Sequence, residues 1–173
     1  GLFLLVKNPE LLKKRLNTKE KEREQKKNVT ISALLFVVAF VIAGLNWRFN
    51  WILLPNVYVW SVSIIFILSY ILYAEVMKEN TYLSRVVEVQ INQKVVDTGM
   101  YGIVRHPMYL ATTILFLSMP LVLSSPLSFV IMLGYIPVIV KRIKNEEKIL
   151  EQGLDGYSDY KKRVKYRMIP YVW

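Results

Sequence analysis

Long apolar runs alternate with charged segments along the chain, and this pattern predicts its main elements. Segments 29–47 and 57–77 each carry about the 20 mainly apolar residues that a helix needs to cross a bilayer core of roughly 30 Å. A third apolar run, 108–140, is too long for one crossing. Ser124-Ser125-Pro126 divides it, because proline removes a helical hydrogen-bond donor and disfavours helix in the residue before it. We therefore predict a helical hairpin with the arms 108–123 and 127–140.

These segments predict an all-α integral membrane protein with about four transmembrane helices, folded as one domain over 1–173. Within it we separate an N-terminal segment, two transmembrane helices and a region that holds the candidate chemistry, with the bounds 1–28, 29–77 and 78–173.

The distribution of cations predicts the orientation of the chain in the membrane. Nine Lys and Arg fall in 7–27 and nine in 141–167, but Arg48 alone lies in the 45–56 loop. Because positive loops stay on the cytoplasmic side, both termini and 78–107 should be cytoplasmic.

Composition excludes several classes of function. The net charge of +10 reflects the asymmetry of the loops and favours attraction to anionic lipid over binding to nucleic acid. The chain has no Cys and a single His, so disulfides, a Cys nucleophile and a multi-His metal centre are excluded. We expect no metal. The oligomeric state cannot be read from the sequence.

The remaining segments carry weaker signals. The first six residues resemble the end of an upstream helix and are too short for a signal peptide. Segment 9–27 predicts an exposed or interfacial helix because of its dense mixed charge. Residues 46–56 predict a turn with only a structural role, and the alternation in 86–93 predicts an extended loop held against the helices.

The candidate chemistry lies at the entrance of the third apolar run. Gly99–Tyr109 reads GMYGIVRHPMY and places Tyr101, Arg105, His106 and Tyr109 there. Taken alone, His106-Pro107 is explained by a proline in the first helical turn and a histidine bonded to a carbonyl. Arg105 by itself is explained as a cation that anchors the helix at the interface.

A second polar cluster, Arg142-Ile-Lys-Asn-Glu-Glu147, follows the hairpin on the same predicted side. Arg142 and Glu146 are four residues apart on a helix and could form a surface ion pair. The alternative is that both clusters form one site. In that case the tyrosines could pack on an adenine or a sulfonium methyl group, and Glu146 and Arg142 could bind an ammonium and a carboxylate.

The order GMYGIVRHPMY, a Ser-Pro break, R-x-x-x-E-E and Y-x-x-Y…R-x-I-P resembles the isoprenylcysteine carboxyl methyltransferase family of integral membrane enzymes, over about 78–170. The phospholipid methyltransferases are relatives of that family, and membrane sterol reductases share RHP-x-Y. The resemblance implies S-adenosylmethionine as methyl donor, a lipophilic or prenylated acceptor and membrane lipid as surroundings. It also implies a catalytic pair, Arg142 and Glu146, with Arg142 facing the acceptor. The cofactor contacts that it implies are Gln93, Lys94, Val95, Val96, Tyr101, His106, Pro107, Met108, Tyr109 and Glu146.

Some positions depart from the family pattern. The usual G-P-Y-R reads Gly99-Met-Tyr-Gly102, and L-x-x-x-F-G-x-x-Y is compacted to Leu150–Tyr157. The second change affects the acceptor side, whereas the cofactor side is nearly intact. The sequence leaves three acceptors open: an isoprenylcysteine-like carboxylate, a phospholipid amine or another small apolar acid. A nicotinamide-dependent sterol-type reductase and a non-catalytic membrane scaffold or transport accessory remain as alternatives.

Overall fold

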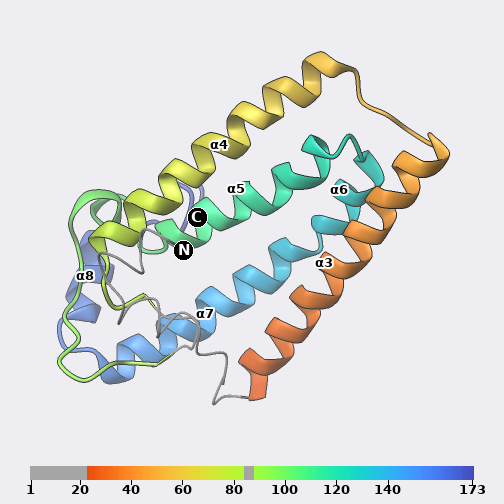
Figure 1. Ribbon diagram of the computed structural model, residues 1–173. Coiled ribbons are helices and arrows are strands. Elements are labelled where there is room, and N and C mark those ends of the chain that lie inside the picture. Colours follow the sequence, from red (N-terminus) through yellow and green to blue (C-terminus); the bar gives the residue numbers. More distant parts are fainter. Residues whose placement is uncertain (1–22, 84–87) are drawn as a thin grey trace. The chain divides into compact units, whose positions relative to one another are not determined.

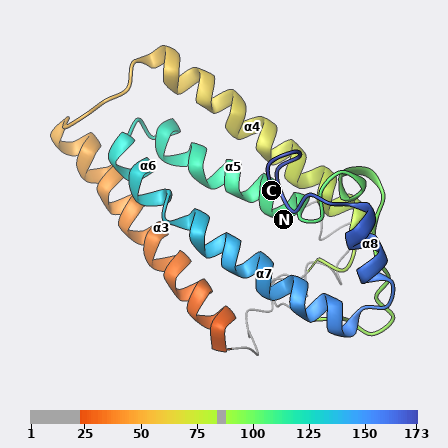
Figure 2. The ribbon, with the colours of Figure 1, turned by 180° about the vertical axis from the view of Figure 1, so that it is seen from behind.

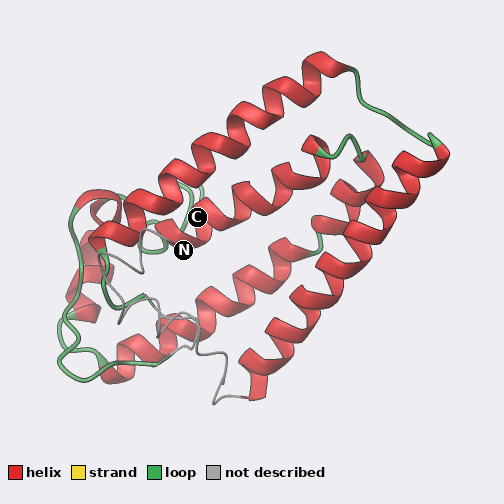
Figure 3. Ribbon diagram, in the orientation of Figure 1, coloured by secondary structure: helices red, strands yellow, loops and turns green. Residues whose placement is uncertain are grey.

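The computed structural model describes residues 23–83 and 88–173, and within them every regular element is a helix (Figures 1 and 3). Within the described residues three helical stretches, Lys26–Phe49, Asn56–Glu79 and Pro126–Gly153, are long and apolar enough to cross a membrane, and the apolar helix Pro107–Val122 is shorter. The prediction of an all-α integral membrane protein is therefore confirmed. The predicted helix in 9–27 falls mostly outside the described residues.

The first two predicted crossings correspond to α3, Arg23–Phe49, and α4, Asn56–Glu79. Each extends beyond its predicted apolar segment by a few polar residues at both ends. Their most apolar windows reach mean hydropathies of 2.4 and 2.0, and only 17% and 6% of those windows are buried. Apolar side chains that surround a helix on all sides are typical of lipid contact, and a helix satisfies its own backbone hydrogen bonds there.

The third apolar run forms α5, Pro107–Val122, α6, Pro126–Met132, and α7, Tyr135–Gly153. The predicted break at Ser124–Pro126 is confirmed: Ser125 accepts a hydrogen bond from the Ser128 N–H and Pro126 begins α6. A second interruption at Leu133–Gly134 was not predicted. It places Pro137 in the first turn of α7, where its missing N–H costs no helical hydrogen bond.

The chain divides into two compact units, each built from separate stretches of sequence. Among the described residues, the first comprises 23–27, 76–83, 88–107 and 142–173, and the second comprises 28–75 and 108–141. The second unit contains most of the apolar helical residues. The first contains the polar segments in which the sequence predicts a site.

Aromatic rings and small residues hold the second unit together. Phe36 of α3, Phe116 of α5 and Tyr135 of α7 meet edge to face, with ring centroids 4.6–6.3 Å apart. Between α3 and α6 the buried Ala39 permits close approach, and the Ser128 hydroxyl donates to the Ala39 carbonyl at 2.7 Å. Small residues and single hydrogen bonds of this kind are typical of packing between membrane helices.

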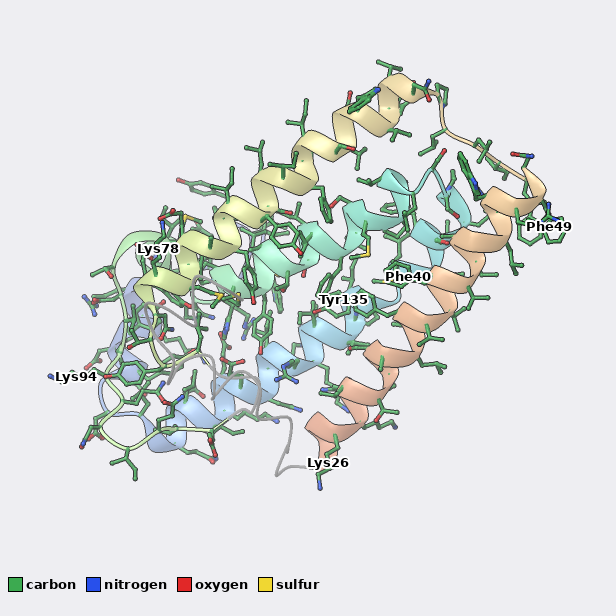
Figure 4. The ribbon with its side chains drawn as sticks, viewed as in Figure 1. Lys26, Phe40, Phe49, Lys78, Lys94 and Tyr135 are labelled. Carbon is green, nitrogen blue, oxygen red and sulfur yellow. The ribbon has the colours of Figure 1, made fainter. Side chains whose placement is uncertain are left out.

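Asn46 organises the turn that follows α3. Its side-chain amide is fully buried, donates to the carbonyls of Ile52 and Ser124 at 2.8 and 3.2 Å, and accepts from the Ile52 N–H at 3.2 Å. The Ser124 hydroxyl accepts from the Leu54 N–H at 2.7 Å. The two turns of this unit are thus joined by side-chain hydrogen bonds. At the same end, the labelled Phe49 stacks on Trp51 with centroids 5.9 Å apart (Figure 4).

The first unit consists of short helices and loops. The 3-10 helix η1, Gly99–Gly102, begins at a glycine with φ 51°. Glu79, the last residue of α4, accepts from the Met100 N–H at 3.2 Å. A side chain at Gly99 would displace the Glu79 carboxylate, and the left-handed backbone conformation at this position favours glycine. Residues 88–98 are a loop, as predicted for the described part of 86–93, whereas 84–87 lie outside the described residues.

Replacing Asn46 with Ala should lower the free energy of unfolding by about 1–3 kcal/mol, because the buried carbonyl of Ser124 and the partly buried N–H of Ile52 lose a partner. Thermal unfolding in detergent, followed by tryptophan fluorescence, measures the change. Ser61→Ala is the control, because that exposed hydroxyl only bonds a carbonyl of its own helix. Equal midpoints for the two variants would contradict the role given to Asn46.

Candidate functional site

The centre of the first unit is the carboxylate of Glu147, on α7. The Nε and Nη2 atoms of Arg105 both lie 2.8 Å from its Oε1, and Nε2 of His106 lies 3.3 Å from the same atom. Arg167 donates from Nε to Oε2 at 2.9 Å. The side chains of Arg105, His106 and Glu147 are each only 4% exposed. We call Arg105, His106, Glu147 and Arg167 the ion cluster.

Arg105 also binds the chain that follows α8, Tyr157–Arg163. Its Nη1 donates to the carbonyls of Val164 and Lys165 at 2.6 and 2.9 Å. The interpretation of Arg105 as an interfacial anchor is therefore wrong, because the guanidinium is buried and bonded within the protein. The partners of Arg105 come from two segments that are distant in the sequence, so its neighbours along the chain do not reveal them.

Backbone pairing reinforces this connection. The N–H groups of Arg105 and His106 donate to the carbonyls of Tyr166 and Arg167 at 2.9 and 2.8 Å, and Val104 forms a parallel bridge with Tyr166. The chain then turns back on itself: the N–H groups of Met168 and Ile169 donate to the Trp173 carbonyl. Figure 2 shows this last segment after α8. Arg167 stacks over the Trp173 ring at 5.4 Å, which holds its guanidinium beside Glu147.

Three buried tyrosines lie in the same unit. The Tyr160 hydroxyl donates to the Tyr101 carbonyl at 2.8 Å, and the rings of Tyr157 and Tyr160 are 5.8 Å apart. Burial raises the pKa of Tyr101, Tyr157 and Tyr160 above the ordinary value. The negative charge of Glu146 adds to the increase for Tyr101 and Tyr157, so it lies near both rings. All three phenols are neutral at physiological pH and can donate hydrogen bonds.

The hydroxyl of Tyr157 has no hydrogen-bond partner among the described residues, although it is buried. An unsatisfied buried hydroxyl is costly and uncommon in a folded protein. This hydroxyl lies within the electrostatic reach of Glu147, Glu146 and Arg105. Like the Tyr101 hydroxyl, which also lacks a hydrogen-bond partner among the described residues, it is a polar atom of this unit for which a bound group would supply a missing partner.

The predicted cofactor loop joins the same unit. Val95 packs against a buried cluster made of Leu154, Tyr157, Tyr160 and Val164. Gln93 is half-buried and its side chain accepts from the Gln90 N–H at 2.8 Å, Val96 is half-buried, and Lys94 is exposed at the edge of the loop (Figure 4).

The structure brings many of the predicted residues together in one unit. Tyr101, His106, Glu146, Arg142 and the loop 93–96 belong to the first unit, and Arg142 and Glu146 are half-buried on α7. The buried Pro107 starts α5, as its place after His106 predicts. Met108 and Tyr109 belong to the second unit, so their part in one site with the others stays a prediction. The predicted ion pair between Arg142 and Glu146 also stays a prediction.

Sequence reasoning chose Glu146 and overlooked the central role of Glu147. A signal for Glu147 was present, since Ile139, Ile143 and Glu147 are spaced by four residues and form one helical face. All three are at most 3% exposed. A carboxylate in register with two core isoleucines must be buried, and therefore needs cationic partners. Arg167, Tyr157 and Tyr160 were noticed only as part of a basic, tyrosine-rich tail.

The fold and the ion cluster define a class of protein, a multi-pass membrane protein with a buried polar centre. The start of α5, the end of α7 and the chain after α8 form this centre. The model of the isoprenylcysteine carboxyl methyltransferase family matches residues 59–152, just over half of the chain. The chain belongs to this family, which confirms the resemblance found in its motifs.

A segment of 79 residues is also similar to the Delta(14)-sterol reductase TM7SF2 of Mus musculus, with 38% identity. The similarity covers 44% of this chain and 19% of the reductase, so the chain spans about a fifth of the length of that relative.

Replacing Glu147 with Gln should lower the free energy of unfolding by about 3–5 kcal/mol, because two buried or half-buried guanidinium groups lose their counter-charge. The midpoint of thermal unfolding in detergent measures this. Glu151→Gln is the matched control on the same helix: its exposed pair with Lys161 should contribute less than about 1 kcal/mol. Similar small losses in both variants would show that the ion cluster does not stabilise the first unit.

Proposed function

We propose that the protein is an S-adenosylmethionine-dependent membrane methyltransferase. Its acceptor is the carboxylate of a lipophilic, isoprenylcysteine-like substrate. The observation that carries this proposal is the contact of Arg105 and His106 with Glu147, which joins the RHP segment to the R-x-x-x-E-E helix within one unit. Family membership supports the reaction class.

The residues of the first unit fit the chemical groups of this cofactor. Its ammonium requires a carboxylate, its adenine requires an apolar or aromatic surface, and its polar edges require hydrogen-bond donors. Glu146 is half-buried and electrostatically close to Tyr101 and Tyr157. Tyr157 offers a buried hydroxyl that lacks a partner among the described residues. The carboxylate, the aromatic rings and the donor are thus in one neighbourhood.

The division of roles follows from charge. When bound, the cofactor supplies a sulfonium methyl group that transfers by in-line displacement. Glu146 would bind the cofactor ammonium, and Tyr101, His106, Pro107 and the loop 93–96 would line its binding site, as would Met108 and Tyr109. Arg142 would orient the acceptor carboxylate through a bidentate bond. A carboxylate is already a nucleophile at neutral pH, so no general base is needed, and positioning alone can supply effective molarities of about 10⁵ M.

The ion cluster has a supporting role in this proposal. Glu147 is occupied by Arg105, His106 and Arg167, and it fixes the turn of α7 that also carries Glu146. Glu147 is therefore a positioning residue. The lipophilic character of the acceptor is supported by the exposed apolar faces of α3 and α4, because the protein works where lipid-soluble substrates are concentrated.

Substituting the two α7 residues separates their roles. Glu146→Ala should weaken binding of S-adenosylmethionine at least tenfold in calorimetry, because a charge-assisted bond to the ammonium is lost. Arg142→Ala should keep cofactor binding within about threefold and reduce methyl transfer at least a hundredfold, since the acceptor is no longer oriented.

Lys144→Ala is the matched control, because Lys144 is exposed on the same turn of α7. Lys144→Ala should change neither the affinity for S-adenosylmethionine nor the rate of methyl transfer. Equally small losses of cofactor affinity in Glu146→Ala and Lys144→Ala would contradict the proposed ammonium site. Absence of cofactor binding by the folded wild-type protein would contradict the whole proposal.

The local similarity to a sterol reductase favours a second candidate, a membrane reductase that uses a nicotinamide cofactor. A phospholipid N-methyltransferase is a third possibility within the family's relatives. An amine acceptor must arrive deprotonated, and Arg142 would repel its protonated form or bind a neighbouring phosphate. The carboxylate acceptor suits an arginine better.

Labelling distinguishes these candidates. Membranes that contain the protein are incubated with S-adenosylmethionine carrying a labelled methyl group, and the label should appear in a base-labile methyl ester of a prenylated peptide or similar lipophilic acid. Membranes with Arg142→Ala serve as the control. Label in phospholipid headgroups would indicate the amine acceptor. Oxidation of a reduced nicotinamide without methyl incorporation would favour the reductase and contradict our proposal.

A further inference from the structure

A pocket in the first unit lies outside the ion cluster and has no role in the proposed reaction. It has a volume of about 300 Å³, and its lining includes Ile103, Arg163, Lys165, Tyr166 and Tyr171. A single water needs only about 10–15 Å³ of such space, so the pocket can hold a polar group of several heavy atoms.

The pocket has firm walls. One wall is the backbone pairing of 104–106 with 166–167, and Arg105 clamps the carbonyls of Val164 and Lys165 from behind. The other wall is the C-terminal turn, closed by the hydrogen bonds to the Trp173 carbonyl, with the rings of Tyr166 and Tyr171 5.1 Å apart. Because these walls are fixed by the fold, a ligand would not have to order them.

The charges point to an anion. Five cations lie between 161 and 167, and four have carboxylate partners: Lys161 with Glu151, Lys162 with Asp159, Arg163 with Asp97, and Arg167 with Glu147. Lys165 is the exception, since it forms no ion pair with a carboxylate of the described residues, and it lines the pocket. Arg163 shares the lining, although Asp97 at 2.8 Å offsets part of its charge.

The surroundings of the pocket point to lipid. Ile103 is 52% exposed and Tyr171 88% exposed, and beside them Ile169 and Val172 are exposed as well. Such apolar and aromatic side chains are unfavourable in water but suit the boundary between headgroups and hydrocarbon of a bilayer. Lys165, which forms no ion pair with a carboxylate of the described residues, matches the negative surface of an anionic leaflet.

We propose that this pocket binds the phosphate headgroup of an anionic phospholipid, with Lys165 and Arg163 on the phosphate and Ile103 and Tyr171 against the start of the acyl chains. The site is separate from the methyl-transfer chemistry and does not depend on it. It would fix the C-terminal segment, and with it Arg167, at the membrane surface.

Native mass spectrometry of the full chain in detergent tests the proposal, with dioleoyl phosphatidylglycerol and dioleoyl phosphatidylcholine as probes. The wild-type protein should retain phosphatidylglycerol preferentially. Lys165→Gln should weaken that binding about fivefold, and the double substitution Arg163→Gln with Lys165→Gln should weaken it about tenfold or more. Soluble glycerol 3-phosphate at the same concentration should not compete, because it lacks the chains that contact the apolar residues.

Lys162→Gln is the matched control, because it removes one charge three residues from Lys165, outside the pocket lining. It should bind phosphatidylglycerol like the wild type. Equal losses for Lys162→Gln and Lys165→Gln would mean diffuse attraction to the basic segment and would overturn the site. So would equal retention of the two lipids, or full competition by glycerol 3-phosphate. Lys165 is exposed, so its substitution should leave the midpoint of thermal unfolding unchanged. Binding of S-adenosylmethionine, measured on the same preparations, tests the proposed enzyme separately from the lipid site.

Discussion

The first unit depends on one physical constraint: the carboxylate of Glu147 is buried and must be neutralised where it lies. Water cannot solvate it, so Arg105, His106 and Arg167 have to approach it. These residues lie 42, 41 and 20 positions away in the sequence. A single buried charge therefore assembles the start of α5, the end of α7 and the chain after α8. The positions of the neighbouring Glu146 and Tyr101 follow from this assembly.

The second unit follows a different rule. Its surface is apolar, and Asn46 in the turns and Ser128 between helices find their hydrogen-bond partners inside the protein. Neither requires a charge partner. Apolar helices with single hydrogen bonds suit a bilayer, whereas dense ion pairing suits the boundary with water. Each compact unit thus has the chemistry of the surroundings that its sequence predicts.

This difference bears on the proposed function. A methyltransferase with a lipophilic acceptor has to hold a charged nucleoside derivative close to hydrocarbon, and the proposed function assigns this task to the first unit. Glu147 is surrounded by structural partners, whereas the half-buried Glu146 lies electrostatically near Tyr101 and Tyr157, and this position makes it our candidate for a ligand. In the same way, the pairing of the other cations of 161–167 distinguishes Lys165 from its neighbours. For Lys165, the accounting of charges, rather than the abundance of charged residues, supports the proposed site.

The sequence by itself determined the elements that depend on local composition. The length and hydropathy of 29–47 and 57–77 predicted α3 and α4, prolines marked the starts of α5 and α6, and the ordered motifs predicted the family. Only the tertiary structure decided which side chains surround the Glu147 carboxylate, where Arg105 points, and that Tyr157–Arg163 forms a helix. A membrane span is a property of about 20 consecutive residues and can be read locally. An ion cluster is a property of residues far apart in the sequence, and its partners become known only when the chain has folded.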